Sequence, residues 1–216
     1  MHFNSNLVKT HKDLPGHTSL LIHSTIGCNL NCLGCLNRDI VSNKHNSINE
    51  LELLNKIRLN GFLFDAIILS GNEFLMSPLE NIISFLNQLK QVFSGAIIIN
   101  TNGAYPDKII AINSLIDGFH IDFKIHPDFD IEKKEYILGI TSISIERYER
   151  NMLRSIDFII KKDKPLSRIR TVHYPVLDDY DISLLKEYIY ILKQDYDSNV
   201  PYDINEFFEL EMLKEA

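Results

Sequence analysis

Short apolar runs that alternate with helical segments constrain the fold of this chain more than any other feature of its sequence. The runs 65–70 and 96–100 are rich in isoleucine, as is typical of strands buried on both faces of a parallel sheet. We predict strands at 19–24, 65–70, 96–100, 118–124 and 168–173, a sixth strand or an irregular close at 201–208, and helices between them at about 47–61, 78–93, 107–115, 144–162 and 182–196. This alternation implies parallel strands with right-handed crossovers. The predicted fold is therefore α/β, built as an open doubly wound sheet or as an incomplete barrel.

The predicted helix at 47–61 has a distinct start and end. Ser47 and Glu50 form a capping-box pattern, and Leu51, Leu54 and Ile57 follow at helical spacing. Gly61 is expected to end the helix.

Length and composition predict one soluble domain. The chain has 216 residues, of which 45% are hydrophobic and 24% charged, and no apolar run approaches the roughly 20 residues of a membrane span. We predict a single domain over 1–216, with a core at about 17–205, an N-terminal lead-in at 1–16 and a C-terminal tail at 206–216. The polar start Met1–Lys12 shows no signal segment, and the clustered cysteines suit a reducing compartment, so a cytoplasmic location is expected. A formal net charge of -7 without a basic run argues against a nucleic-acid partner.

Polar groups follow the predicted strands, at the edge where α/β folds gather their functional side chains. The cysteines follow the first strand, 70–73 the second and 101–103 the third. The fourth strand ends with Asp122 and Lys124, and the fifth with His173. We therefore expect these groups to face one mouth of the fold.

Cys28, Cys32 and Cys35 are the only cysteines in the chain and form a CxxxCxxC triplet. Four thiolates normally complete a cubane iron–sulfur cluster, so three would leave one iron open to a ligand. A zinc site with His23 or His45 as a fourth ligand is an alternative, although structural zinc sites usually show two separated ligand pairs. A redox CxxC pair would use only Cys32 and Cys35, and chance clustering would use none. The spacing favours a cluster.

On these residues the chain resembles the radical S-adenosylmethionine (AdoMet, SAM) enzymes. The triplet after a first strand is typical of that superfamily, and Ser70-Gly71-Asn72-Glu73 is similar to its Gly-Gly-Glu motif. Within the superfamily the chain most resembles the glycyl-radical enzyme activases, which include the activating proteins of anaerobic ribonucleoside-triphosphate reductase and of pyruvate formate-lyase. The segments that carry this likeness, in order, are Asp13–Gly16, Gly27–Asn37, Thr101–Gly103, Asp122–Lys124 and Arg170–Pro175. Two residues depart from these family patterns. Asn72 replaces the second glycine of the Gly-Gly-Glu motif, and Leu36 stands where many activases carry histidine or another residue with a ring. Asparagine tolerates left-handed backbone, but weaker AdoMet binding or a differently held methionyl end is expected.

The resemblance implies a partial (β/α)6 TIM-type barrel of the radical SAM type. It implies a 4Fe-4S cluster held by Cys28, Cys32 and Cys35, with AdoMet on the fourth iron. Reductive cleavage would then give methionine and a 5′-deoxyadenosyl radical. No auxiliary cluster can be built from three cysteines, which argues against maturases that carry extra clusters.

The resemblance also implies an AdoMet site that comprises Gly71, Asn72, Glu73, Thr101, Asn102, Asp122, Lys124 and His173. Glu73 would accept from the methionine ammonium, Lys124 would neutralise the carboxylate, and Asp122 would bind the ribose hydroxyls or the ammonium. Gly71 serves backbone geometry, Thr101 shapes the strand turn and Asn102 reaches ribose or adenine. The alternatives are a solvated helix-start acid at Glu73, a mutual Asp122–Lys124 salt bridge and a structural role for His173.

By the same resemblance, the partner is a glycyl-radical protein, the large subunit of an anaerobic (class III) ribonucleotide reductase. The electron donor is a flavodoxin-type or other low-potential protein. A radical SAM enzyme that modifies a small molecule or a peptide is one alternative function. A non-catalytic metal-binding module is another, from a different class.

Overall fold

The computed structural model describes residues 1–37, 46–140 and 142–208. The chain divides into two compact units. The first comprises Met1–Cys28, Asn37–Thr101 and Asp107–Phe119, and the second Asn29–Leu36, Asn102–Pro106 and His120–Ala216.

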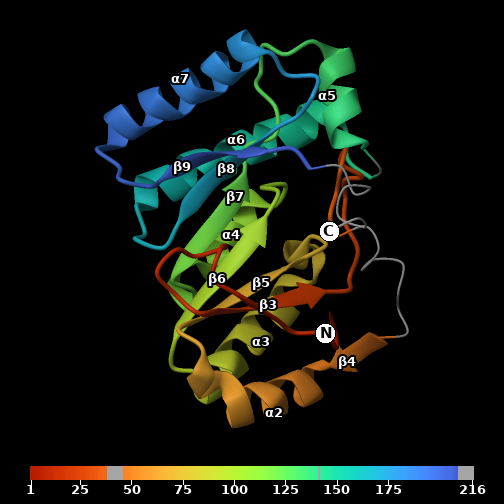
Figure 1. Ribbon diagram of the computed structural model, residues 1–216, viewed down its shortest axis with the longest axis vertical. Coiled ribbons are helices and arrows are strands. Elements are labelled where there is room, and N and C mark those ends of the chain that lie inside the picture. Colours follow the sequence, from red (N-terminus) through yellow and green to blue (C-terminus); the bar gives the residue numbers. More distant parts are fainter. Residues whose placement is uncertain (38–45, 141, 209–216) are drawn as a thin grey trace. The chain divides into compact units, whose positions relative to one another are not determined.

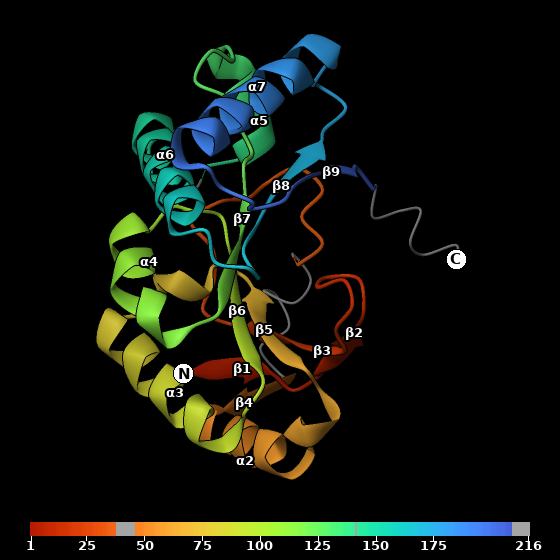
Figure 2. The ribbon, with the colours of Figure 1, turned by 90° about the vertical axis from the view of Figure 1, so that its left-hand side faces the viewer.

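The first unit is built on three parallel strands, β3 (Ser19–Ser24), β5 (Ala66–Gly71) and β6 (Ala96–Thr101). β3 pairs with β5 from Ser19↔Ala66 to Ser24↔Gly71, and β5 pairs with β6. Residues 66–70 of β5 are all buried, as the sequence predicts for an apolar run without polar alternation. Figure 2 shows α3 (Leu79–Val92) and α4 (Pro106–Ile112) on the same side of β5 and β6. Ile82, Phe85, Leu86 and Leu89 form the buried stripe of α3.

Three short antiparallel strands extend the sheet of the first unit. They are β1 (His2–Asn4), β2 (Val8–Thr10) and β4 (Ser47–Asn49), and the order is β4-β1-β3-β5-β6 with β2 also on β3. The sequence does not predict them, because three residues are too few to show a strand period.

Strand β4 corrects the predicted start of the first helix. Ser47 pairs with Asn4 in the sheet, so the predicted capping box at Ser47 and Glu50 is wrong. The cap of α2 (Glu50–Asn60) is instead Asn49, which accepts from the Glu52 backbone at 3.0 Å while Glu52 accepts from the Asn49 backbone at 2.9 Å.

The second unit contains a parallel ladder and three helices, drawn from green to blue in Figure 1. Strand β7 (Gly118–Asp122) begins in the first unit and continues in the second, where it pairs with β8 (Arg168–His173), and β8 pairs with β9 (Tyr202–Glu206). The helices are α5 (Ile131–Leu138), which was not predicted, α6 (Ile145–Lys162) and α7 (Asp179–Tyr196). The uncertain segment 201–208 therefore contains a true strand, β9.

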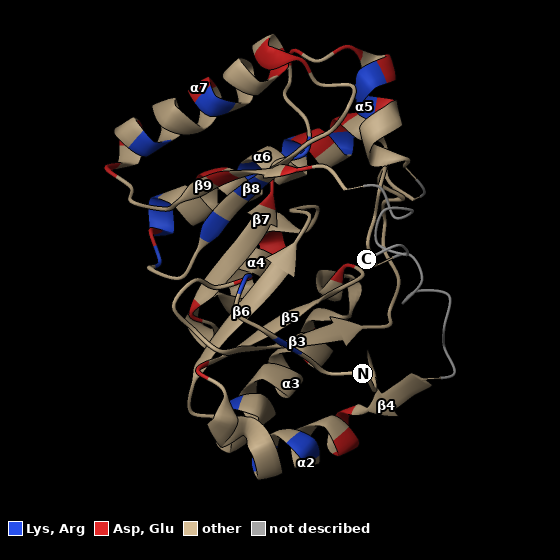
Figure 3. Cartoon of the chain, viewed as in Figure 1, with Lys and Arg blue, Asp and Glu red and all other residues tan. Residues whose placement is uncertain are grey.

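The strands of the two units differ in charge, as Figure 3 shows. Strands β3, β5 and β6 contain no Lys, Arg, Asp or Glu, whereas β7, β8 and β9 carry several. On β8 the charged residues alternate with buried ones: Arg168 and Arg170 are half-buried, and Ile169 and Thr171 are buried. One face of β8 is therefore polar and the other is packed.

Within the described residues, no helix is both long and apolar enough to cross a membrane.

Candidate functional site

The Gly71–Glu73 turn follows β5 and depends on glycine at its first position. Gly71 has a φ of +91°, and a Cβ there would lie 2.8–2.9 Å from backbone atoms of Ser24 and His23. No side chain fits in that space. Asn72 is not among the residues with positive φ, so its backbone does not require glycine. The departure from a Gly-Gly-Glu pattern is thus compatible with the turn.

Glu73 is held in one orientation. Its side chain is buried, and Oε1 accepts from the Leu75 backbone N–H at 3.2 Å and from the Thr101 hydroxyl at 3.0 Å. Lys108 donates to the carbonyls of Leu75 and Ser77, and burial lowers the pKa of Lys108 while the charge of Glu73 opposes that shift. Glu73 does begin a short 3-10 turn, Phe74–Met76, but it is not the solvated acid of the alternative interpretation.

Both ends of the cysteine segment, residues 27–37, are hydrogen-bonded to the Gly71–Glu73 turn within the first unit. The Glu73 backbone N–H donates to the carbonyl of Gly27 at 2.8 Å, one residue before Cys28. The Asn37 side-chain amide donates to the carbonyl of Gly71 at 3.3 Å, two residues after Cys35. The turn predicted to bind AdoMet and the segment predicted to bind iron are therefore fixed to each other at two points.

The middle of the cysteine segment belongs to the second unit, where helix α5 holds it. Asn31 N–H donates to the carbonyls of Leu138 and Gly139, and Leu33 N–H donates to the carbonyl of Ile137. The residue just past the helix, Gly139, has a φ of +46°, and a Cβ there would collide with the Asn31 carbonyl. The C-terminal end of α5 thus positions Cys32, a role that sequence reasoning missed because no helix was predicted at 131–138.

The three thiols form no disulfide. Cys28 and Cys35 are half-buried and Cys32 is buried. Burial raises the pKa of the Cys32 thiol, and the ammonium of Lys124 partly offsets that shift. A buried thiol with a raised pKa is a poor nucleophile, whereas coordination to a metal deprotonates a thiol outright. The site therefore suits a metal ligand better than a reactive cysteine.

The donor set fits an iron–sulfur cluster. Three cysteines within eight residues of sequence offer soft sulfur ligands, of the kind that iron–sulfur clusters use. In the ranges 1–37, 46–140 and 142–208, no three His, Cys, Asp or Glu side chains are already gathered as a metal site. Of the two histidines considered as zinc ligands, His23 is buried in β3 and burial lowers its pKa, and His45 lies outside the described residues.

Asn102 orders the cysteine segment. Its amide nitrogen donates to Asn29 Oδ1 at 2.9 Å, and its amide oxygen accepts from the Ala104 N–H at 3.0 Å. The Tyr148 hydroxyl donates to the Asn102 carbonyl at 2.9 Å. Because Asn29 directly follows Cys28, this hydrogen bond helps to hold the cysteine segment in place. Its contact with ribose or adenine stays a prediction.

Asp122 and Lys124 form the salt bridge that was considered as their alternative role. Lys124 Nζ lies 2.9 Å from Asp122 Oδ2, and Arg170 Nη2 lies 3.1 Å from Asp122 Oδ1. Burial alone would raise the pKa of Asp122, but Lys124 and Arg170 bring that pKa below its usual value. Burial alone would lower the pKa of Lys124, but Asp122 holds it well above the ordinary range. Both side chains are therefore charged near neutral pH.

Arg170 was missed as a site residue, although the sequence offered a signal. Arg168 and Arg170 stand at alternate positions of a predicted strand and so share one face. Pairing of β7 with β8 places Asp122 opposite Arg170.

His173 lies at the exposed end of β8, with Nε2 3.1 Å from the carbonyl of Leu177. By strand alternation it points to the same side as Thr171, away from the side of Arg170. The structure therefore does not bring His173 together with Asp122 and Lys124, and its contact with AdoMet stays a prediction.

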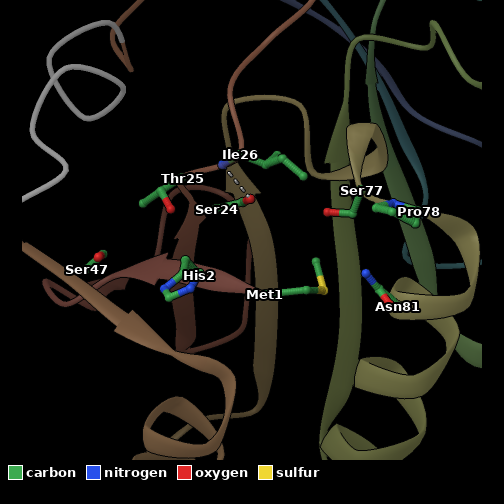
Figure 4. Close-up of a pocket in the computed structure, with 9 residues that line it drawn as sticks. All are labelled: Met1, His2, Ser24, Thr25, Ile26, Ser47, Ser77, Pro78 and Asn81. Carbon is green, nitrogen blue, oxygen red and sulfur yellow. Dashed lines mark hydrogen bonds between the residues drawn. The ribbon is translucent and has the colours of Figure 1, made fainter.

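A cavity of about 330 Å³ lies in the first unit, between the segment after β3 and the start of α3. Figure 4 shows the residues around it, which include Met1, His2, Ser24, Ile26, Ser77 and Asn81. None of the predicted site residues lines it.

Solved structures similar to this chain share its fold. The structure of anSMEcpe with bound AdoMet matches with a TM-score of 0.58 at 14% identity, over 88% of this chain and 52% of that one. QueE from Escherichia coli matches with a TM-score of 0.50 at 14% identity, over 95% of this chain and 83% of QueE. Coproporphyrinogen III oxidase (HemN) from Escherichia coli, a radical SAM enzyme, matches with a TM-score of 0.51 at 11% identity, over 88% of this chain and 42% of HemN. The chain thus spans about half the length of anSMEcpe.

At these identities the likeness concerns the fold, and it confirms the predicted α/β fold of the radical SAM type. None of the curated protein sequences compared with the chain matches it. A family model described as "4Fe-4S single cluster domain" matches residues 15–160, a range that includes all three cysteines and the Gly71–Glu73 turn. Because this match covers more than half of the sequence, the chain belongs to the 4Fe-4S single cluster domain family.

Proposed function

We propose that this protein is a radical SAM enzyme. Cys28, Cys32 and Cys35 would hold a 4Fe-4S cluster, and the Gly71–Glu73 turn would bind the methionine end of AdoMet. The observation that carries the proposal is the double attachment of that turn to the cysteine segment, through Gly27 and Asn37. When bound, the cluster and AdoMet supply one-electron cleavage of the sulfonium to methionine and a 5′-deoxyadenosyl radical.

The chain's own residues would orient AdoMet. Glu73, fixed by Thr101, accepts from the ammonium of the ligand, because a buried carboxylate favours a charge-assisted partner. Lys124 would neutralise the ligand carboxylate. Asp122, fixed by Lys124 and Arg170, accepts from ribose hydroxyls. These assignments follow the resemblance and the charges of each side chain.

We further propose that the enzyme activates a glycyl-radical protein, the large subunit of an anaerobic ribonucleotide reductase, with electrons from a flavodoxin-type or other low-potential donor. Support comes from the ordered activase-like segments from Asp13–Gly16 to Arg170–Pro175 and from a chain with cysteines for a single cluster. We also propose that 1–216 functions as one domain located in the cytoplasm.

A second candidate is modification of a peptide. The fold is similar to that of anSMEcpe, which has also been solved with AdoMet and the Cp18Cys peptide.

The test uses protein reconstituted with iron and sulfide without oxygen and then reduced with dithionite. With AdoMet it should release 5′-deoxyadenosine, and with AdoMet and a candidate reductase it should produce a glycyl-radical signal in electron paramagnetic resonance. Cys32→Ala and a reductase without its radical glycine are the controls. Release of 5′-deoxyadenosine without a glycyl signal would favour the peptide candidate. Absence of both a cluster spectrum and 5′-deoxyadenosine would favour a non-catalytic metal-binding module.

A further inference from the structure

Asn72 carries a buried side-chain amide that forms no hydrogen bond within the described residues. The residue is 8% exposed, and neither Oδ1 nor Nδ2 has a hydrogen-bond partner among the described residues. Buried amides are normally paired, because leaving one unpaired costs stability. An orphaned amide of this kind in a native protein calls for a ligand or a bound water.

The backbone on both sides of Asn72 is held in place. Gly71 is fixed by its positive φ and by the close approach of Ser24. The carbonyl of Gly71 is bound by Asn37, and the N–H of Glu73 is bound to Gly27. Asn72 thus lies between two residues whose backbone groups are hydrogen-bonded to Gly27 and Asn37, so its own backbone has little freedom to shift.

Backbone geometry does not explain the amide. Asn72 does not adopt positive φ, so asparagine has not been placed there for its tolerance of left-handed backbone. Nor does the side chain serve as a cap, since it accepts no hydrogen bond from the described residues. A hydrogen-bonding molecule that enters the site would satisfy both polar atoms of the amide.

We infer that Asn72 is a specificity-determining contact for the α-amino-acid end of the ligand at this turn. An amide offers both an acceptor, Oδ1, and donors on Nδ2, so it can receive from an ammonium and donate to a carboxylate at once. This pairing matches a zwitterionic amino acid, and Glu73, the next residue, adds a carboxylate for the ammonium. The inference rests on the proposed binding of AdoMet. It predicts that asparagine strengthens binding relative to glycine, the reverse of what the departure from the motif suggests.

The decisive measurement is the dissociation constant for AdoMet by calorimetry on reconstituted, unreduced protein, which needs no turnover. Asn72→Gly and Asn72→Ala should each weaken binding by about 10- to 100-fold, the usual cost of lost hydrogen bonds to charged groups. Asn72→Asp should weaken the binding of AdoMet more than the binding of decarboxylated AdoMet. Only AdoMet has a carboxylate of its own, which the new aspartate would repel. Asn113→Ala, which alters another asparagine of the first unit with a buried unpaired oxygen, is the matched control and should leave both constants unchanged.

Thermal unfolding without ligand separates this role from a structural one. Asn72→Ala and Asn72→Leu should melt no lower than the wild type, because no internal hydrogen bond is lost. If both melt clearly lower, or if Asn72→Gly binds AdoMet as tightly as the wild type or more tightly, the inference is overturned. If the wild type binds no AdoMet at all, the proposed function fails instead.

Discussion

The hydroxyl of Thr101, at the end of β6, donates to the carboxylate of Glu73 at 3.0 Å across 28 positions of sequence. Both residues are buried, so this bond fixes the orientation of an acid that water does not solvate. It also links the ends of two neighbouring parallel strands.

Thr101→Val should lower the free energy of unfolding by about 1.5–3 kcal/mol, because it removes a hydrogen bond to a buried carboxylate. Urea unfolding measures the loss. Thr101→Ser, which keeps the hydroxyl, is the control and should retain most of the stability. Equal losses in the two variants would show that the hydroxyl, which Thr101→Val removes, contributes no more than the methyl group, which Thr101→Ser removes.

Replacement of any one of Cys28, Cys32 or Cys35 by alanine should abolish stable cluster assembly. The wild type should bind about four irons and four sulfides per chain after anaerobic reconstitution, as expected for a cubane cluster. Iron analysis and the visible absorption spectrum provide the measurement. A variant of one cysteine that keeps the full iron content would remove that cysteine from the ligand set.

Gly71→Ala should destabilise the protein by about 2–4 kcal/mol, because it combines strained backbone with a clash against backbone atoms of Ser24 and His23. Gly16 provides the matched control: its φ is +81°, but no atom lies within 4 Å of the position that a Cβ would occupy. Gly16→Ala should therefore cost only about 1 kcal/mol for the backbone strain. Chemical denaturation of both variants tests the difference, and similar costs would contradict the close packing of Gly71.

Asp122→Asn should cost about 2–3 kcal/mol, less than the roughly 3–5 kcal/mol of a fully buried pair, because the Asp122 side chain is 31% exposed. The cost arises from Lys124, which is left buried beside a neutral amide. Asp203→Asn is the control, since the Arg168–Asp203 pair is more exposed and should contribute at most about 1 kcal/mol. If both variants lost the same stability in urea, the buried position of Lys124 would have no effect.

His120 should make the protein sensitive to acid. Its burial, together with the charges of Arg170 and Arg168, lowers its pKa from 6.5 to about 3. The unfolded chain then takes up a proton below about pH 6.5 that the folded chain refuses, so stability falls as pH falls. We expect a contribution of about 1.4 kcal/mol per pH unit between about pH 6 and pH 3.

The variant His120→Leu isolates this effect. The difference in unfolding free energy between the wild type and His120→Leu should shift by that slope below pH 6 and stay constant above pH 7. A difference that is independent of pH across the whole range would show that the imidazole is accessible to protons in the folded protein.

Of the strands β3, β5, β6, β7, β8 and β9 in the described residues, the sequence predicted the first five and left β9 open, because apolar runs such as 65–70 carry their own signal of burial on both faces. It did not predict β1, β2 or β4, since three residues show no period, and for that reason it placed the cap of α2 two residues too early. It also missed α5, whose eight residues lie outside any strong apolar pattern.

In the candidate site, too, only the features with a local sequence signal could be predicted. The spacing of Cys28, Cys32 and Cys35 and the order of the motifs indicated the metal chemistry, because ligand type and spacing along the chain are local properties. Only one of the two partners of Asp122 could be predicted from the sequence. Lys124 is two residues away, whereas Arg170 is 48 positions away.

Periodicity, donor chemistry and backbone freedom belong to individual segments, so the sequence was enough to predict the class of fold, the three cysteines proposed as ligands and the need for glycine at position 71. Three relationships appear only in the folded protein: Gly27 and Asn37 bind the Gly71–Glu73 turn, Arg170 neutralises Asp122, and the amide of Asn72 has no partner among the described residues. These relationships depend on which distant groups burial places within hydrogen-bond distance, and no local pattern records that outcome.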